Sequence, residues 1–150
     1  MDSIFKDTTI SCFIERINKI SESSIAEWGK MNPYQMLKHC TESEKVNLGE
    51  LKLKRLFIGR LFGRVALQSI IKDGAKEKKN SPTHPALVIS ETGDVEQQKV
   101  ALINQLKKYS KANQSAFASR IHPFFGKMSI NEWDMLICKH LDHHLRQFGV

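Results

Sequence analysis

The sequence lacks the features of a disulfide-stapled, secreted or membrane-spanning chain. Its three cysteines, Cys12, Cys40 and Cys138, are odd in number and widely spaced, with no CxxC pair. We therefore expect free thiols in a reducing, cytoplasmic setting. No stretch approaches the roughly 18 uninterrupted apolar residues of a membrane-spanning helix, so we expect no membrane partner. Because acidic residues already occur at Asp2 and Asp7, we also expect no leader at the N-terminus.

Acidic residues are scarce in one part of the chain, between Lys52 and Lys79. The basic residues there are Lys52, Lys54, Arg55, Arg60, Arg64, Lys72, Lys76, Lys78 and Lys79, opposed by Asp73 and Glu77. This segment alone accounts for the net charge of +7 of the whole chain. It holds few aromatics for base stacking, namely Phe57 and Phe62. We interpret it as a solvated helix face followed by a loop and do not expect nucleic acid as a partner, although a basic nucleic-acid-binding module is an alternative.

Apolar residues recur mostly at helical spacing, which predicts an all-α fold in a single domain over residues 1–150. The main helices are expected over about 8–20, 33–49 and 94–113, with a last helix that follows Ser129 and includes 133–148. Asn32 before Pro33 is typical of a helix start, and Ser129 with Glu132 matches a capping box.

The region between the second and third main helices predicts a connection rather than a second domain. Its basic part suggests a short helix, or two, interrupted by Gly59 and Gly63, and the loop that follows includes a brief extended piece over 86–89. The expected architecture is therefore a four-helix bundle with one long crossover connection between the second and third main helices.

Two histidines lie on the apolar stripe of the last helix. At about 100° per residue, the stripe contains Trp133, Leu136, Ile137, Leu141, Leu145 and Phe148, with His140 and His144 in its middle, one turn apart. That i, i+4 spacing lets both rings hold one metal ion. Alternatively, the rings form a buried hydrogen-bonded network.

A third imidazole is available from another helix. His39 projects at the edge of the apolar stripe of the second main helix, and it can meet His140 and His144 if those helices are neighbours. A metalloprotease is excluded, because Leu141 stands where an H-E-x-x-H enzyme carries its glutamate base.

Two segments carry a family resemblance. One is WGKMNPYQMLKHC over residues 28–40, and the other is HPFFGKMSINEW over 122–133, continuing to KHLDHHLRQFG over 139–149. They resemble the DinB-like superfamily of metal-dependent four-helix bundles, of the YfiT type, and especially one of its domain-of-unknown-function subfamilies. Residues 49–119 match only in helical outline.

The resemblance implies a three-histidine metal site at His39, His140 and His144. Zinc or nickel suits such an imidazole-rich set. The implied activity is a transfer to a small-molecule substrate that uses a low-molecular-weight thiol such as bacillithiol or mycothiol, or a metal-dependent hydrolysis. The resemblance also implies a homodimer. The alternative is a non-catalytic structural or dimerising bundle with a buried histidine network.

Several neighbours of the predicted ligands stay as candidates with open roles. His143 could be an alternative ligand or act as an acid or base beside the site. Cys40, His122 and Trp133 are candidate pocket residues, and His122, held extended before a proline, could instead be a structural hydrogen-bonder. Glu42 and Glu44 are weak candidates for a carboxylate that would hold a ligand histidine.

Overall fold

The computed structural model describes residues 2–72 and 78–150, and it is mostly helical with a small two-stranded sheet. Its helices are α1 (Asp7–Asn18), α2 (Pro33–Asn47), α3 (Phe57–Ile71), α4 (Val95–Leu106) and α5 (Ile130–Gln147), with short 3-10 turns over Pro85–Leu87, Tyr109–Lys111 and Gln114–Ser119. Strands β1 (Ile121–His122) and β2 (Gly126–Lys127) pair antiparallel. Three charges of the basic segment, Asp73, Lys76 and Glu77, lie outside the described residues.

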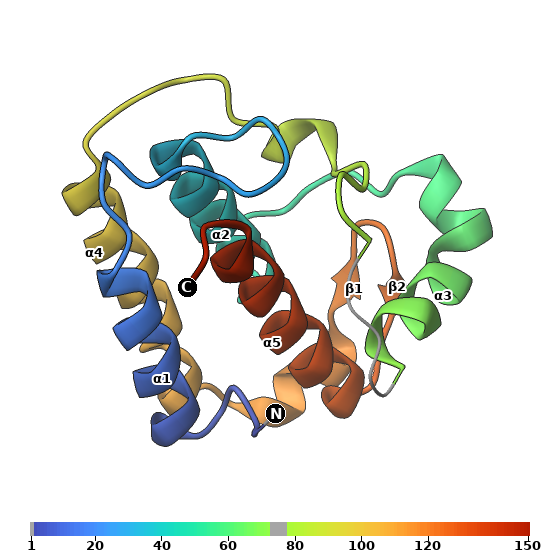
Figure 1. The fold of residues 1–150 in the computed structure, drawn as a ribbon. Coiled ribbons are helices and arrows are strands. Elements are labelled where there is room, and N and C mark those ends of the chain that lie inside the picture. The colour runs from blue at the N-terminus through green and yellow to red at the C-terminus, as the bar shows by residue number, and fades with distance from the viewer. Residues whose placement is uncertain (1, 73–77) are drawn as a thin grey trace.

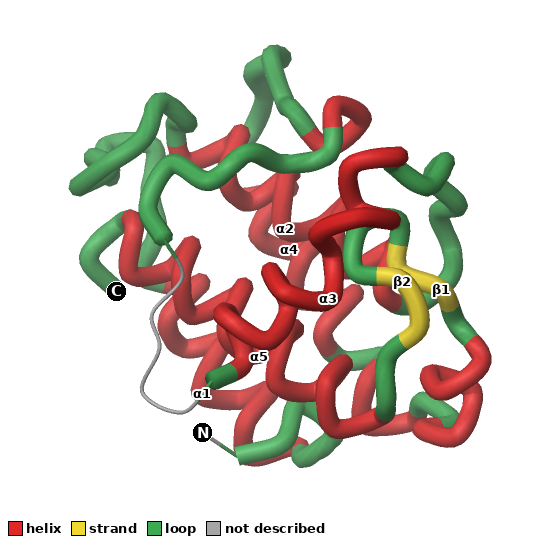
Figure 2. The backbone as a smooth tube through the Cα atoms, turned by 90° about the vertical axis from the view of Figure 1, so that its right-hand side faces the viewer, coloured by secondary structure: helices red, strands yellow, loops and turns green. Residues whose placement is uncertain are grey.

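Four helices enclose the core. Helix α2 packs against α4 and α5, and α1 packs against the same two helices, which closes the ring (Figure 1). Trp133, Ile137 and Leu141 of α5 are buried in this core with Met36 and Leu37 of α2. Helix α3 lies outside the ring and contacts α5 and β2, as Figure 2 shows from that side.

Local signals set the starts of α2 and α5. The Asn32 side chain accepts from the Gln35 amide, and the Gln35 side chain accepts from the Asn32 amide in return. Ser129 and Glu132 form the same reciprocal pair. Both predicted helix starts are confirmed, and each cap satisfies amides that have no partner within the helix.

The prediction that Gly59 and Gly63 interrupt the basic helix is wrong, because α3 is continuous through both. Each glycine faces the hairpin formed by β1, β2 and the turn between them, where an added Cβ would collide with the backbone carbonyl oxygen of Phe124. Glycine costs about 1 kcal/mol inside a helix, but here it lets the backbones of α3 and the hairpin approach closely.

Three other expectations about elements also need correction. Helix α4 ends at Leu106 rather than near residue 113, and the 3-10 turns that follow place Tyr109 and Phe117 in the core. The piece expected to be extended over 86–89 begins with the 3-10 turn Pro85–Leu87, whose first amide is capped by His84 Nδ1. Strands β1 and β2 form a β-hairpin before α5, so the fold is mostly helical rather than all-α as expected. Within the described ranges, no helix has the length and apolarity needed to cross a membrane.

Candidate metal centre

Three histidines meet between α2 and α5. His39 projects from α2, and His140 and His144 project from α5 one turn apart. Each offers a ring nitrogen, and these three nitrogens lie within 4.8 Å of one another. His39 Nε2 and His140 Nε2 are 3.2 Å apart. His39 and His144 are buried and His140 is partly buried, so the cluster lies at the edge of the core.

The ring of His39 is oriented by the crossover connection. Its Nδ1 lies 2.9 Å from the carbonyl oxygen of Leu87, in the 3-10 turn Pro85–Leu87. A carbonyl oxygen can only accept, so Nδ1 carries the proton and donates it. In the neutral ring, Nε2 therefore keeps its lone pair, and it points toward His140.

The ring of His144 is oriented by Gln147. Gln147 Nε2 donates to the carbonyl oxygen of Trp28 at 2.8 Å, which leaves Gln147 Oε1 to accept from His144 Nδ1 at 3.0 Å. By the same logic, His144 Nε2 keeps its lone pair. Gly29 makes room for this arrangement, since a Cβ there would lie 2.6 Å from Gln147 Nε2 and its φ is +82°. An outer hydrogen bond of this kind is typical of metal-binding histidines.

Burial keeps the three rings neutral. It lowers the pKa of His39, against a smaller opposing effect of the hydrogen bond to Leu87. Burial, and then the proximity of the other two rings, lowers the pKa of His140 well below its usual value. Burial lowers the pKa of His144 to about 3, with His39 as a lesser cause. Neutral imidazole is the form that binds metal ions, so no proton has to leave a charged ring at neutral pH.

The residues present fit a divalent ion. A Zn–N distance of about 2.0–2.1 Å places the ligand nitrogens of a tetrahedral site roughly 3–4 Å apart, close to the separations in this cluster. Because His39 Nε2 is an acceptor, His140 Nε2 donates to it at 3.2 Å in the metal-free protein, and a bound cation would replace this proton. Three imidazoles without a thiolate or carboxylate favour zinc, nickel or copper over magnesium or calcium.

The other predicted site residues lie outside these converging nitrogens. His143 is buried with its ring edge-on to Trp28, at a centroid distance of 5.7 Å. Burial, followed by the nearby charge of Arg146, lowers its pKa. Cys40 is buried with its Sγ 3.8 Å from Met36 Sδ.

His122 has the hydrogen bonds of a structural residue. Its Nδ1 accepts from the backbone amides of Phe124 and Phe125, both at 3.1 Å, and so closes the turn of the hairpin. Its ring packs against Phe125 and the buried Trp133. Burial, followed by the proximity of His84, lowers the pKa of His122 to about 3. These contacts favour the role of a structural hydrogen-bonder for His122 over that of a pocket residue.

Neither candidate carboxylate holds a ligand histidine. Glu42 pairs with Lys45 at 2.8 Å and with Lys38 at 3.4 Å. Glu44 is buried and accepts from the Tyr109 hydroxyl and from the Asn47 amide. Sequence reasoning missed Gln147, although its position three residues after His144 on one helix face was the available signal.

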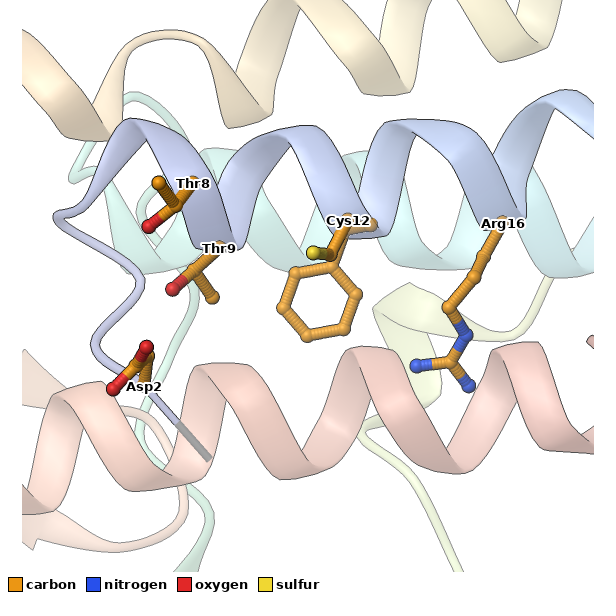
Figure 3. Close-up of a pocket in the computed structure, with 6 residues that line it drawn as sticks. Asp2, Thr8, Thr9, Cys12 and Arg16 are labelled. Atoms are coloured by element: carbon orange, nitrogen blue, oxygen red, sulfur yellow. The ribbon is translucent and has the colours of Figure 1, made fainter.

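A surface pocket lies away from the cluster, along α1 (Figure 3). It is lined by Asp2, Thr8, Thr9, Cys12, Phe13 and Arg16, and none of the three histidines contributes to it. Arg16 also pairs with Asp142 of α5 at 3.0 Å.

Fold and cluster together define a mostly helical protein with a three-histidine centre that could hold a metal ion. The chain belongs to the family described as protein of unknown function (DUF1569), whose model matches residues 6–149. The expected membership of a domain-of-unknown-function family is thereby confirmed at that level. No curated protein and no solved structure matches the chain.

Proposed function

We propose that this protein is a divalent-metal-binding four-helix bundle of the DinB-like type, with His39, His140 and His144 as ligands. One observation carries the proposal: three neutral imidazoles converge, while the outer nitrogens of two of them are held by Leu87 and Gln147. The ring of packed helices and the likeness of segments 28–40 and 122–149 to that superfamily support it.

The proposed reaction joins a low-molecular-weight thiol to a small electrophilic substrate: the thiol loses its proton to solvent, its sulfur forms a bond to the electrophilic carbon, and the leaving group of that carbon departs with the electron pair of the broken bond. We propose that it takes place in the cytoplasm and in a homodimer. A bound zinc or nickel ion would supply Lewis acidity, which lowers the pKa of a coordinated thiol or water. The chain's own contribution is orientation, since Leu87 and Gln147 fix the ring nitrogens toward one point. Three protein ligands leave a coordination position open, as in catalytic zinc sites. Metal-dependent hydrolysis is the second candidate reaction, because a water molecule could occupy the same open coordination position.

Metal titration of untagged protein tests the binding step. We expect about one zinc or nickel ion per chain, with a rise in melting temperature that a chelator reverses. His140→Ala should lose both effects and keep its helicity. Gln114→Ala is the control, because Gln114 is exposed in the 3-10 turn Gln114–Ser119 and lies outside the cluster. Absence of binding in the unaltered protein would instead support a structural bundle with a histidine network.

The reaction itself needs a separate assay. Metal-loaded protein should consume a thiol in the presence of an electrophile, or hydrolyse a model ester or amide, and His140→Ala should remove that activity. Stoichiometric metal with no turnover in either assay would contradict the enzymatic part of the proposal and leave the metal site standing.

A further inference from the structure

Helix α3 exposes an apolar stripe to solvent. The stripe consists of Phe57, Ile58, Leu61, Phe62 and Val65, whose exposed fractions run from 57% for Ile58 to 73% for Phe57. At about 100° per residue, these five side chains lie on one side of the helix. Figure 2 views the molecule from the side of α3. Contiguous apolar surface of this kind marks an interaction site more often than scattered single residues do.

The opposite side of α3 is already used by the fold. Gly59, Gly63, Leu67 and Ile71 are buried where the helix meets α5 and β2. A helix that is apolar on both sides normally lies within a protein core or at an apolar boundary. The stripe of α3 therefore calls for a second apolar surface outside the chain.

Positive charge lies along one border of the stripe and at both ends of α3. Residues 51–72 contain six basic residues and no acidic residue, and all six are exposed: Lys52, Lys54, Arg55, Arg60, Arg64 and Lys72. Arg60 and Arg64 lie one turn apart along one border of the stripe, and Arg64 also pairs with Glu132 at 2.9 Å. The other basic residues precede the helix or follow it directly.

We propose that the stripe of α3 docks on an anionic lipid surface. An apolar helix face bordered by lysine and arginine is the pattern of helices that lie in the plane of a membrane interface. Its aromatic and aliphatic side chains would enter the boundary between headgroups and acyl chains, and its cations would meet anionic headgroups. The expectation of no membrane partner concerned spanning helices, and an interfacial helix needs no spanning stretch.

Two other occupants fit less well. A second copy of the chain, docked through the same stripe, would bring two sets of basic residues together and cost electrostatic energy. A nucleic acid would neutralise the cations but would leave five large apolar side chains without apolar contact. The charge pattern thus selects the lipid surface.

Vesicle flotation with the full chain tests this proposal. We expect binding to vesicles of phosphatidylcholine and phosphatidylglycerol that weakens as salt rises, and little binding to phosphatidylcholine alone. Leu61→Ser and Phe62→Ser should each weaken binding about tenfold, and Arg60→Gln about fivefold. Val100→Ser is the matched control, since Val100 of α4 is 57% exposed and lies outside the stripe. It should bind as the unaltered chain does.

Four outcomes would overturn the proposal. Two are no vesicle binding and equal binding by Leu61→Ser. Another is a concentration-dependent dimer that Leu61→Ser dissociates, with no vesicle binding, which would assign the stripe to a second copy. The last is retention on heparin without vesicle binding, which would assign the basic residues to a polyanion. Metal binding by the same variants should stay unchanged, so this test does not depend on the histidine centre.

Discussion

Two buried polar clusters include residues of the same helix, and they differ in the groups to which their buried polar atoms are hydrogen-bonded. His39 and Glu44 both project from α2, five positions apart, and both are buried. Around Glu44, the donors come from the protein itself, namely the Tyr109 hydroxyl and the Asn47 amide. Around His39, the outer ring nitrogen donates to a backbone carbonyl, and the inner one faces another histidine.

This difference separates a structural cluster from a candidate binding site. Burial raises the pKa of Glu44 to about 7, although the hydrogen bonds from Tyr109 and Asn47 oppose the shift. Both donors bind Glu44 Oε2, and among the described residues the buried Glu44 Oε1 has no hydrogen-bond partner, so this cluster leaves one isolated oxygen rather than a converging set of atoms. The histidine cluster directs the Nε2 lone pairs of His39 and His144 inward, and a cation could replace the proton between His39 and His140. Buried polar groups therefore indicate a ligand only when their unused atoms converge.

The largest expected effect is on metal binding, which should depend on the histidine cluster and not on the cluster around Glu44. His144→Ala should lower zinc affinity more than 100-fold, because it removes one of three ligands. Glu44→Gln should keep about one ion per chain, because Glu44 binds only groups of the structural cluster. Elemental analysis after dialysis measures both. Equal metal content in the two variants would erase the proposed distinction.

A smaller effect should follow from the residue that orients a ligand. Gln147→Ala removes the acceptor that holds His144 Nδ1, and loss of such a group typically weakens metal binding 10- to 100-fold. Competition with a chromophoric chelator gives the affinity, and circular dichroism checks the helicity. Gln114→Ala, in an exposed 3-10 turn, is the control. If Gln147→Ala binds zinc as tightly as the control, the orienting role is refuted.

The structural cluster should show its effect in stability instead. Glu44→Ala leaves the buried Tyr109 hydroxyl and the Asn47 amide without their acceptor, which should lower the free energy of unfolding by about 2–3 kcal/mol. Glu44→Gln keeps one acceptor oxygen and should lose less. Urea denaturation of the metal-free proteins measures both values. A Glu44→Ala variant as stable as the unaltered chain would show that the cluster contributes nothing to stability.

The two kinds of buried group should also respond to pH with opposite sign. The pKa of His122 falls to about 3 on folding, so the unfolded chain binds more protons below about pH 6.5, and stability falls as pH is lowered. The pKa of Glu44 rises to about 7, so its contribution is lost as pH rises from about 4.5 to 7.

Each group can change the free energy of unfolding by at most about 1.4 kcal/mol per pH unit. Denaturation of the metal-free protein between pH 4 and 8 measures the slopes. His122→Asn offers an amide oxygen in place of Nδ1 and should reduce the slope of the free energy of unfolding against pH below about pH 6.5. Glu44→Gln should reduce that slope between about pH 4.5 and 7. Unchanged slopes in both variants would contradict these assignments.

The smallest effect is expected at His143. Its ring lies against Trp28 rather than among the converging nitrogens, so His143→Gln should change zinc affinity less than twofold. A loss as large as that of His144→Ala would make His143 a ligand and would require a different site. The same chelator competition decides between these results.

Local features of the site could be predicted from the sequence. Asn32 with Pro33 and Ser129 with Glu132 mark the helix starts, since capping depends on neighbours three residues away. The positions of His140 and His144 on one face follow from helical periodicity alone. The same periodicity places His39 at the edge of an apolar stripe.

Contacts between distant segments could not be predicted in this way. The hydrogen bond between His39 and Leu87 spans 48 residues, and that between Gln147 and Trp28 spans 119. Gly59 and Gly63 were misread as helix breakers because their role depends on the approach of Phe124 from the hairpin. Such contacts arise from the packing of α2, α3, α5 and the connections between them, which periodicity does not encode.

The most direct test of the histidine centre is X-ray absorption spectroscopy of the untagged protein loaded with one equivalent of zinc. The account predicts a shell of nitrogen and oxygen ligands at about 2.0–2.1 Å, with outer scattering from three imidazoles and no sulfur. The His39→Ala variant should show fewer imidazoles. A sulfur ligand at about 2.3 Å, or the same imidazole count with and without His39, would contradict the proposed centre.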